Sequence, residues 1–230
     1  MKTPLPFLLL ALIAAGPLAA QQPLSPAPID PAKYHAPIKV ACIRDSITHG
    51  AGAPNGQSYP DQLQTMLGSG WQVRNFGVSS RTLLKKGDYP YMIEKAFQDA
   101  QQYQPDVVII MLGTNDTKPQ NWVFHDDFYA DYRSLIAAFA NLPGKPRIYI
   151  CRPCPVPAPG NFGITEVNIQ IEIPIIDRLA AEENLGEIDM HAALVNTPEL
   201  QPDHVHPNAA GAHAMAAAAY KALTGKAPAN

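Results

Sequence analysis

The stretch VACIRDSITHG, residues 40–50, begins with apolar or small side chains and turns polar at Arg44, Asp45 and Ser46. A short apolar run that ends in a glycine-containing loop is typical of a buried strand in a parallel sheet. We therefore predict a strand over residues 39–43. Polar side chains that directly follow such a strand lie at the carboxyl edge of the sheet, where parallel sheets form their sites.

The rest of the chain alternates between apolar runs and helical patterns. The alternation predicts a three-layer α/β/α domain in which helices cover both faces of a sheet of about five parallel strands. The further strands are predicted over residues 71–76, 106–112, 147–151 and 186–189, and the helices over residues 59–67, 90–103, 128–141, 167–184 and 206–223.

The amino-terminal part differs from the domain that follows it. Residues 1–20 contain one positive charge at Lys2, then a short apolar run, then small residues. This is the layout of a secretory signal peptide, so the protein is expected to be secreted or periplasmic. Residues 21–37 are rich in proline and predict a linker or an arm lying on the domain. The domain itself is expected to span residues 38–225.

Charge and cysteine content exclude several classes of function. The formal net charge is −3 and the charges are scattered, so no basic surface for nucleic acid is expected. No segment after the amino terminus is long and apolar enough to cross a membrane. Cys151 and Cys154 form a C-x-x-C motif, but the prolines beside Cys154 disfavour the helix that a redox motif needs. A structural disulfide and free thiols both remain open.

Polar groups follow several of the predicted strands. Ser46 follows the first strand, Gly77 the second in NFGVSS, and Asn115 the third in LGTND, whereas Asp203 and His206 precede the last helix in PDHVHPN. Ester hydrolysis needs a nucleophile, a base, a carboxylate that orients the base, and donors for the oxyanion. Each residue alone has a simpler explanation, such as a turn or a helix cap. Their conjunction at one sheet edge favours a catalytic site.

These four blocks resemble those of the SGNH hydrolase superfamily, also called GDSL esterases, over essentially the whole domain. The resemblance implies a flavodoxin-like sheet and a serine esterase that needs no cofactor. A metal site is not expected, because Asp203, His204 and His206 leave a metal ion one ligand short. It implies Ser46 as the nucleophile, His206 as the general base and Asp203 as the carboxylate that orients it. The oxyanion hole then consists of the backbone N–H groups of Ser46 and Gly77 and the side-chain amide of Asn115.

The sequence around the blocks is more specific. The segments SYPDQLQTMLG, WQVRNFGVSSRTLLKKGDYPY and YQPDVVIIMLGTND are similar to exported bacterial carbohydrate esterases that remove acetyl groups from polysaccharides. The resemblance implies a short acyl ester of a carbohydrate as the substrate, with a lysophospholipase or thioesterase as the alternative. Substrate contacts are expected from Arg44, Asp45, Asn121 and Trp122. For Trp122, a role as a loop anchor is the other interpretation.

Two positions depart from the family pattern. Arg44 stands where the family has a glycine before Asp-Ser, and His204 stands where the last block has a glycine. If position 44 needs a positive φ, Arg44 is strained; otherwise it projects into the cleft or solvent and pairs with Asp45 or Asp116. An obstructing Arg44 would leave a sugar-binding protein with an inert triad, and Arg44→Gly would then speed acylation. His204 competes as a base, but the three-residue Asp-to-His spacing favours His206.

Overall fold

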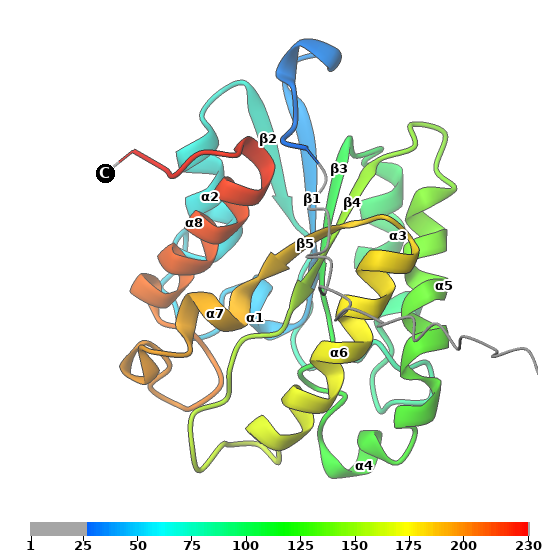
Figure 1. Ribbon diagram of the computed structural model, residues 1–230, viewed down its shortest axis with the longest axis vertical. Coiled ribbons are helices and arrows are strands. Elements are labelled where there is room, and N and C mark those ends of the chain that lie inside the picture. The colour runs from blue at the N-terminus through cyan, green and yellow to red at the C-terminus, as the bar shows by residue number, and fades with distance from the viewer. Residues whose placement is uncertain (1–26, 230) are drawn as a thin grey trace, which may run out of the picture.

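The computed structural model describes residues 27–229, so the predicted signal peptide and the start of the predicted arm lie outside the described residues. Figure 1 shows a central sheet between two groups of helices. The strand order is β2-β1-β3-β4-β5, and every neighbouring pair is parallel. The prediction of a three-layer α/β/α fold with a flavodoxin-like sheet is confirmed. The strands are β1 Ile38–Arg44, β2 Trp71–Asn75, β3 Val107–Met111, β4 Arg147–Arg152 and β5 Gly186–Asp189.

Side chains of each central strand alternate between two hydrophobic cores. Val40 and Cys42 of β1 belong to the core under α2 and α8, whereas Ala41 and Ile43 belong to the core under α3, α5 and α6. Burial on both faces explains why the strand sequence is continuously apolar. The larger helices are α2 Tyr59–Leu67, α3 Lys95–Gln102, α5 Phe128–Ala140, α6 Glu166–Glu182 and α8 Ala209–Thr224.

The order of the strands places the ends of β1 and β3 side by side. Arg44, the last residue of β1, is in register with Met111, the last residue of β3. The chain leaves β1 toward β2 on one side and later enters β3 on the other side. A parallel sheet has its binding crevice at such a reversal, outside the carboxyl ends of the strands. The loops that begin at Asp45 and Leu112 therefore share this crevice.

Several helices differ from the sequence predictions. The helix predicted over residues 90–103 begins as a 3-10 turn at Tyr91–Ile93, and α3 starts only at Lys95 because Glu94 between them is extended. Three short helices were not predicted, since one turn is too short for apolar periodicity to be recognised. These are α1 Ser46–His49, α4 Pro119–Trp122 and α7 Met190–Leu194. The other 3-10 turns are Pro31–Lys33, His125–Asp127 and Pro198–Leu200.

The described part of the amino-terminal arm is attached to the domain. Ile29 is buried, and its N–H donates to the carbonyl oxygen of Leu223 in α8 at 2.7 Å. Within residues 27–229, we find no helix with both the length and the apolar character needed to cross a bilayer.

Candidate active site

The nucleophile candidate is positioned by a one-turn helix that follows β1. The side chain of Asp45 caps α1 by accepting a hydrogen bond from the N–H of Ile47 at 3.0 Å. Gly50 ends the helix with φ +106°, a conformation that glycine adopts without strain. Ser46 is consequently the first residue of α1, two positions past the last residue of β1, and is held at the carboxyl edge of the sheet.

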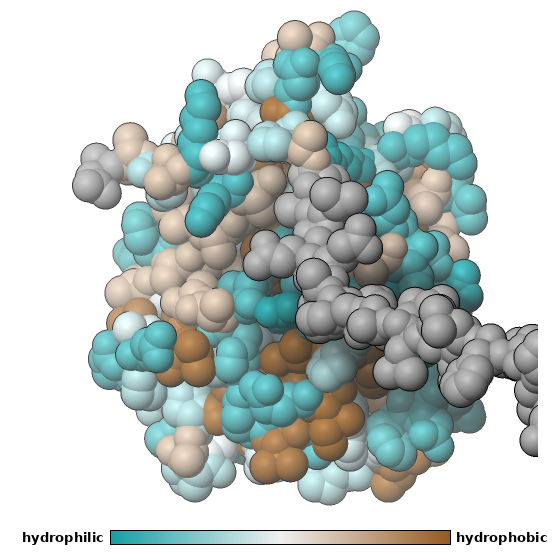
Figure 2. All heavy atoms as spheres, in the orientation of Figure 1, coloured by the Kyte–Doolittle hydropathy of each residue, from teal (hydrophilic) through white to brown (hydrophobic). Residues whose placement is uncertain are grey.

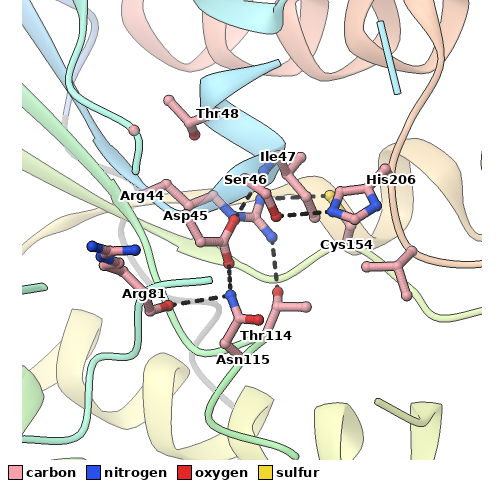
Figure 3. Close-up of polar contacts among 12 residues, drawn as sticks. Arg44, Asp45, Ser46, Ile47, Thr48, Arg81, Thr114, Asn115, Cys154 and His206 are labelled. Carbon is pink, nitrogen blue, oxygen red and sulfur yellow. Dashed lines mark hydrogen bonds and ion pairs between the residues drawn. The ribbon is translucent and has the colours of Figure 1, made fainter. Parts of the chain in front are cut away.

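Three side chains from distant parts of the chain form a hydrogen-bonded series. Oγ of Ser46 lies 2.8 Å from Nε2 of His206 (Figure 3). Nδ1 of His206 lies 2.7 Å from Oδ2 of Asp203. An ionised Asp203 accepts from Nδ1–H, which leaves the lone pair of Nε2 directed at the Ser46 hydroxyl. This is the arrangement in which an imidazole can take the proton of a serine.

The carboxylate of Asp203 is itself held in place. Its Oδ1 accepts hydrogen bonds from the backbone N–H groups of Val205 at 3.0 Å and His206 at 2.6 Å. Partial burial opposes ionisation, but the hydrogen bonds from the His206 backbone and ring and from Val205 together lower the pKa of Asp203. His204 has φ +65°, in the left-handed region that favours glycine, and it is the ring of His206 that contacts Ser46.

Ser46 and His206 open into a cavity of about 260 Å³. A wider hollow of about 550 Å³ lies between β5 and α8, and none of the predicted site residues lines it. The smaller cavity is therefore the candidate site. Its other lining residues are Ala51, Ser79, Ser80, Thr114, Asn115, Lys118, Phe162, Ile164 and Val205.

The prediction of Gly77 as an oxyanion donor is wrong. Gly77 does not line the cavity, and its N–H donates to Oδ1 of Asn75 at 2.9 Å. A Cβ at this position would lie 2.5 Å from the backbone nitrogen of His49. Glycine is thus required here because the end of β2 packs closely against α1, and not because its N–H serves the site.

Ser80 is a candidate for the second oxyanion donor in place of Gly77. It lines the cavity, and its φ of +68° is unusual for a residue other than glycine. In the described part of the chain, the backbone N–H groups of Ser46 and Ser80 donate to no other protein group. Both are therefore available to an oxygen atom in the cavity.

The side chain of Asn115 lines the same cavity from the end of β3. Its Nδ2 donates to Oδ2 of Asp45 and to the carbonyl oxygen of Arg81, each at 3.2 Å (Figure 3). Both bonds are at the long end of the normal range. An oxyanion in the cavity would replace one of these two acceptors of the Nδ2 hydrogens. Before the oxyanion forms, the two hydrogen bonds hold the amide at the edge of the cavity.

Asp116 connects the loop of Asn115 to the loop of Ser80. Its carboxyl accepts hydrogen bonds from the backbone N–H groups of Leu83 at 3.0 Å and Leu84 at 2.7 Å. Burial raises the pKa of Asp116 to about 7, even though these two hydrogen bonds act in the opposite direction. The contact fixes the spacing between two of the three candidate oxyanion donors.

Arg44 neither obstructs the site nor contacts the cavity, so the prediction of a substrate contact is wrong. The residue is the last of β1 in ordinary strand conformation, and its side chain is 0% exposed. Nε lies 3.0 Å from Oδ1 of Asp45, Nη2 donates to Oγ1 of Thr114 at 2.8 Å, and Nη1 donates to Sγ of Cys154 at 3.7 Å (Figure 3). The guanidinium therefore neutralises a buried carboxylate beneath the nucleophile.

The other three residues predicted to contact the substrate do not line the cavity. Asp45 is buried and satisfied by Arg44 and the helix cap. Asn121 is buried, and its Nδ2 donates to the carbonyl oxygen of Asn115 at 2.9 Å. Trp122 packs against the rings of His125 and Phe128, with centroids 5.4 and 6.4 Å away. All three pack within the loops around the site.

Beneath the site lies a layer of buried polar and sulfur-containing groups. Glu172 of α6 lies against Gly113, where an added Cβ would be 2.7 Å from Oε2. Burial raises the pKa of Glu172 well above its usual value, and the nearby Asp116 adds to this shift. All three cysteines are free, so the disulfide considered for Cys151 and Cys154 is absent. Within residues 27–229, no group of three or more His, Cys, Asp or Glu side chains is arranged to hold a metal ion.

Comparisons with known proteins identify the family of the chain. The model of the GDSL-like Lipase/Acylhydrolase family matches residues 43–214. The chain is 42% identical over 207 residues to an acetylxylan esterase of Xylanibacter ruminicola. That alignment covers 81% of this chain but 43% of the relative, so the chain spans less than half of that protein's length.

Solved structures show the same fold at low sequence identity. The acetyl xylan esterase AlAXEase superposes with a TM-score of 0.65 at 24% identity, covering 81% of this chain and 100% of that one. The acetylxylan esterase Axe2 of Geobacillus stearothermophilus gives a TM-score of 0.63 at 23% identity, covering 81% and 94%. The resemblance noted in the sequence is confirmed: the chain belongs to the GDSL-like lipase/acylhydrolase family.

Proposed function

We propose that this protein is a serine esterase that hydrolyses short acyl esters, in particular acetyl esters, of carbohydrates. The observation that carries the proposal is the series from Ser46 through His206 to Asp203, with distances of 2.8 and 2.7 Å. Such a series overcomes the weak nucleophilicity of a serine at neutral pH, because the imidazole accepts the proton as the hydroxyl attacks.

The reaction follows from the positions of these groups. Oγ of Ser46 attacks the ester carbonyl carbon while Nε2 of His206 takes its proton. The oxyanion is met by the N–H groups of Ser46 and Ser80 and by the amide of Asn115. His206 then protonates the leaving alcohol, and the acyl group remains on Ser46. A water molecule then attacks the carbonyl carbon of this acyl-enzyme while Nε2 of His206 takes its proton. Collapse of the resulting tetrahedral intermediate releases the acid, and His206 returns the proton to Oγ of Ser46.

The dimensions and lining of the cavity favour a small acyl group. Its volume is about 260 Å³, below the usual range of drug-sized binding sites of about 300–1,000 Å³. Ile164 and Val205 are buried apolar residues in its wall. The relative of 42% identity is named an acetylxylan esterase, which supports acetyl as the acyl group and a polysaccharide as the alcohol.

The proposal is tested by two measurements on the full chain. Release of acetate from a panel of acetylated polysaccharides is expected for the wild type and lost in Ser46→Ala. A fluorophosphonate probe is expected to label Ser46, because a hydrogen-bonded serine is activated toward phosphorus as well as carbon. Ser79→Ala is the matched control, because it removes a different serine hydroxyl from the same cavity. This variant should retain both labelling and turnover. Folded wild type that is neither labelled nor active would contradict the proposal.

A second assay separates the alternative substrates. Aryl esters of increasing acyl length are expected to be hydrolysed fastest when the acyl group is acetyl. A preference for long chains would instead favour the lysophospholipase or thioesterase. The alternative of an inert sugar-binding protein depended on an Arg44 that obstructs the nucleophile. This argument no longer applies, because Arg44 is buried away from the cavity.

A further inference from the structure

Phe162 lies at the mouth of the catalytic cavity, although it belongs to none of the four sequence blocks. It is one of the lining residues, yet its side chain is 56% exposed. Its ring meets the ring of His206 edge to face, with the centroids 5.7 Å apart. A large aromatic side chain therefore presents apolar surface to solvent directly beside the candidate general base.

The backbone of Phe162 adopts an unfavourable conformation to place the ring there. Its φ is +54°, and for a bulky residue a positive φ is a genuine outlier. The neighbouring Gly160 and Gly163 also have positive φ, but they adopt it freely. Phe162 gains no burial that would offset the strain, because more than half of its surface is exposed.

The turn around Phe162 is fixed to the catalytic loop. Asn161 and Ile164 form a backbone hydrogen bond in each direction, at 3.2 and 2.8 Å. Nδ2 of Asn161 donates to the carbonyl oxygen of Asp203 at 2.9 Å, and Oδ1 of Asn161 accepts from the N–H of Phe162 at 2.8 Å. The ring is thus held in a set position relative to Asp203 and His206.

We propose that Phe162 is a stacking platform for the sugar ring whose hydroxyl carries the acyl group. This inference rests on the proposed esterase function and assigns the contact that the sequence had suggested for Trp122. With the acyl group between Ile164 and Val205, the alcohol part of the ester lies at the mouth of the cavity, where Phe162 is exposed. The C–H face of a pyranose is apolar, and an exposed aromatic ring offers it a rigid surface.

Apolar surface extends along the same segment of the chain. Val167 and Ile171, one helical turn apart on α6, are 71% and 47% exposed. Figure 2 shows hydrophobic side chains gathered over the lower part of α6. The segment that carries Phe162 therefore offers further apolar contact to a polymer longer than one sugar.

The test compares two acetyl esters that differ only in the alcohol. For Phe162→Ala, KM for acetylated xylan is expected to rise roughly two- to tenfold, the range of a single aromatic contact. The rate for ethyl acetate, which has no ring to stack, is expected to stay within about twofold of the wild-type rate. The kcat values for the two esters are expected to stay within the same range. Phe162→Tyr should restore KM, whereas Phe162→Leu should not. Val195→Ala is the control for an exposed apolar residue that lies outside both the cavity and the surface of Val167 and Ile171.

A second readout excludes a merely structural role. Asparagine tolerates positive φ, so Phe162→Asn is expected to raise Tm by about 2–4 °C while it raises KM for acetylated xylan. Equal losses on both esters would overturn the proposal and show that Phe162 positions His206. An unchanged KM for acetylated xylan in Phe162→Ala, or full function in Phe162→Leu, would overturn it as well. Absence of acetate release by the wild type would instead contradict the esterase function itself.

Discussion

Nη2 of Arg44 donates to Oγ1 of Thr114 at 2.8 Å, which ties the last residue of β1 to the loop that carries Asn115. The same guanidinium lies 3.0 Å from the carboxylate of Asp45. Arg44 thus connects the loops that supply the nucleophile and one oxyanion donor. A residue that looked like an obstruction in the sequence is part of the support under the site.

Removal of this support should destabilise the protein without speeding catalysis. Arg44→Ala leaves Asp45 as an unpaired buried carboxylate, and loss of one partner of a buried pair costs about 3–5 kcal/mol. Arg44→Gly should behave alike, with no faster hydrolysis of an aryl acetate. The measurements are the free energy of unfolding in urea and the steady-state rate of aryl acetate hydrolysis, for the wild type and each variant. Arg133→Ala, which removes a half-exposed partner of Glu183, is the control and should cost less than about 1 kcal/mol. A glycine variant that is stable and faster would restore the obstruction hypothesis.

Loss of the Asn115 amide should lower kcat far more than it changes KM. The contact with the substrate oxygen strengthens as negative charge develops, and removal of one such donor costs about 10²–10³ in rate. Asn115→Ala is the variant, assayed with an aryl acetate, and its unfolding curve is recorded in parallel. A kcat within tenfold of wild type in a stable variant would show that the amide only holds Asp45 and Arg81 together.

Ser80 should act through its backbone and not through its hydroxyl. Ser80→Ala and Ser80→Gly both keep the N–H, so kcat is expected to stay within about threefold of the wild type. Since φ is +68°, the glycine variant relieves strain and should unfold at equal or higher urea concentration. A large drop in kcat for both variants would mean that the hydroxyl itself takes part.

The fold was predictable because its signal is repeated along the chain, whereas parts of the site depend on single backbone conformations. Val40 to Ile43 read as a buried strand because both faces of β1 are covered. The convergence of Ser46, Asp203 and His206 was predictable because they occur in blocks of fixed spacing. Gly77 was misassigned because a sequence does not distinguish a glycine needed for packing from one that donates an N–H.

Ser80 and Phe162 were missed for a related reason. Each has a positive φ at a residue other than glycine, which composition does not reveal. Arg44 was misjudged because its partner Thr114 is 70 residues away, and only the pairing of β1 with β3 brings them together. The flanking glycines of Phe162 were the one visible sign of an unusual turn.

The three thiols should react with a disulfide reagent only after unfolding. All are buried and free, and burial raises the pKa of Cys42 to about 12 and that of Cys151 well above its usual value. The thiolate is the reactive form, so native protein should show almost no reaction. Denatured protein should release one equivalent of chromophore for each of its three cysteines. Release of one equivalent would indicate that a disulfide joins the other two.

Titration of Asp116 should make the protein less stable as pH rises from about 4 to about 7. Burial raises its folded-state pKa to about 7 from the ordinary value of 3.8, so in this window the folded protein holds a proton that the unfolded chain has lost. Stability then falls with a slope of up to about 1.4 kcal/mol per pH unit, or on the order of 4 kcal/mol in total. Urea unfolding of wild type and Asp116→Asn at several pH values isolates this contribution. The asparagine side chain next to the N–H groups of Leu83 and Leu84 lowers the free energy of unfolding by the same amount at every pH. The comparison therefore uses the slopes of the free energy of unfolding against pH and not its absolute values. Parallel slopes would show that these two hydrogen bonds keep Asp116 ionised in the folded protein.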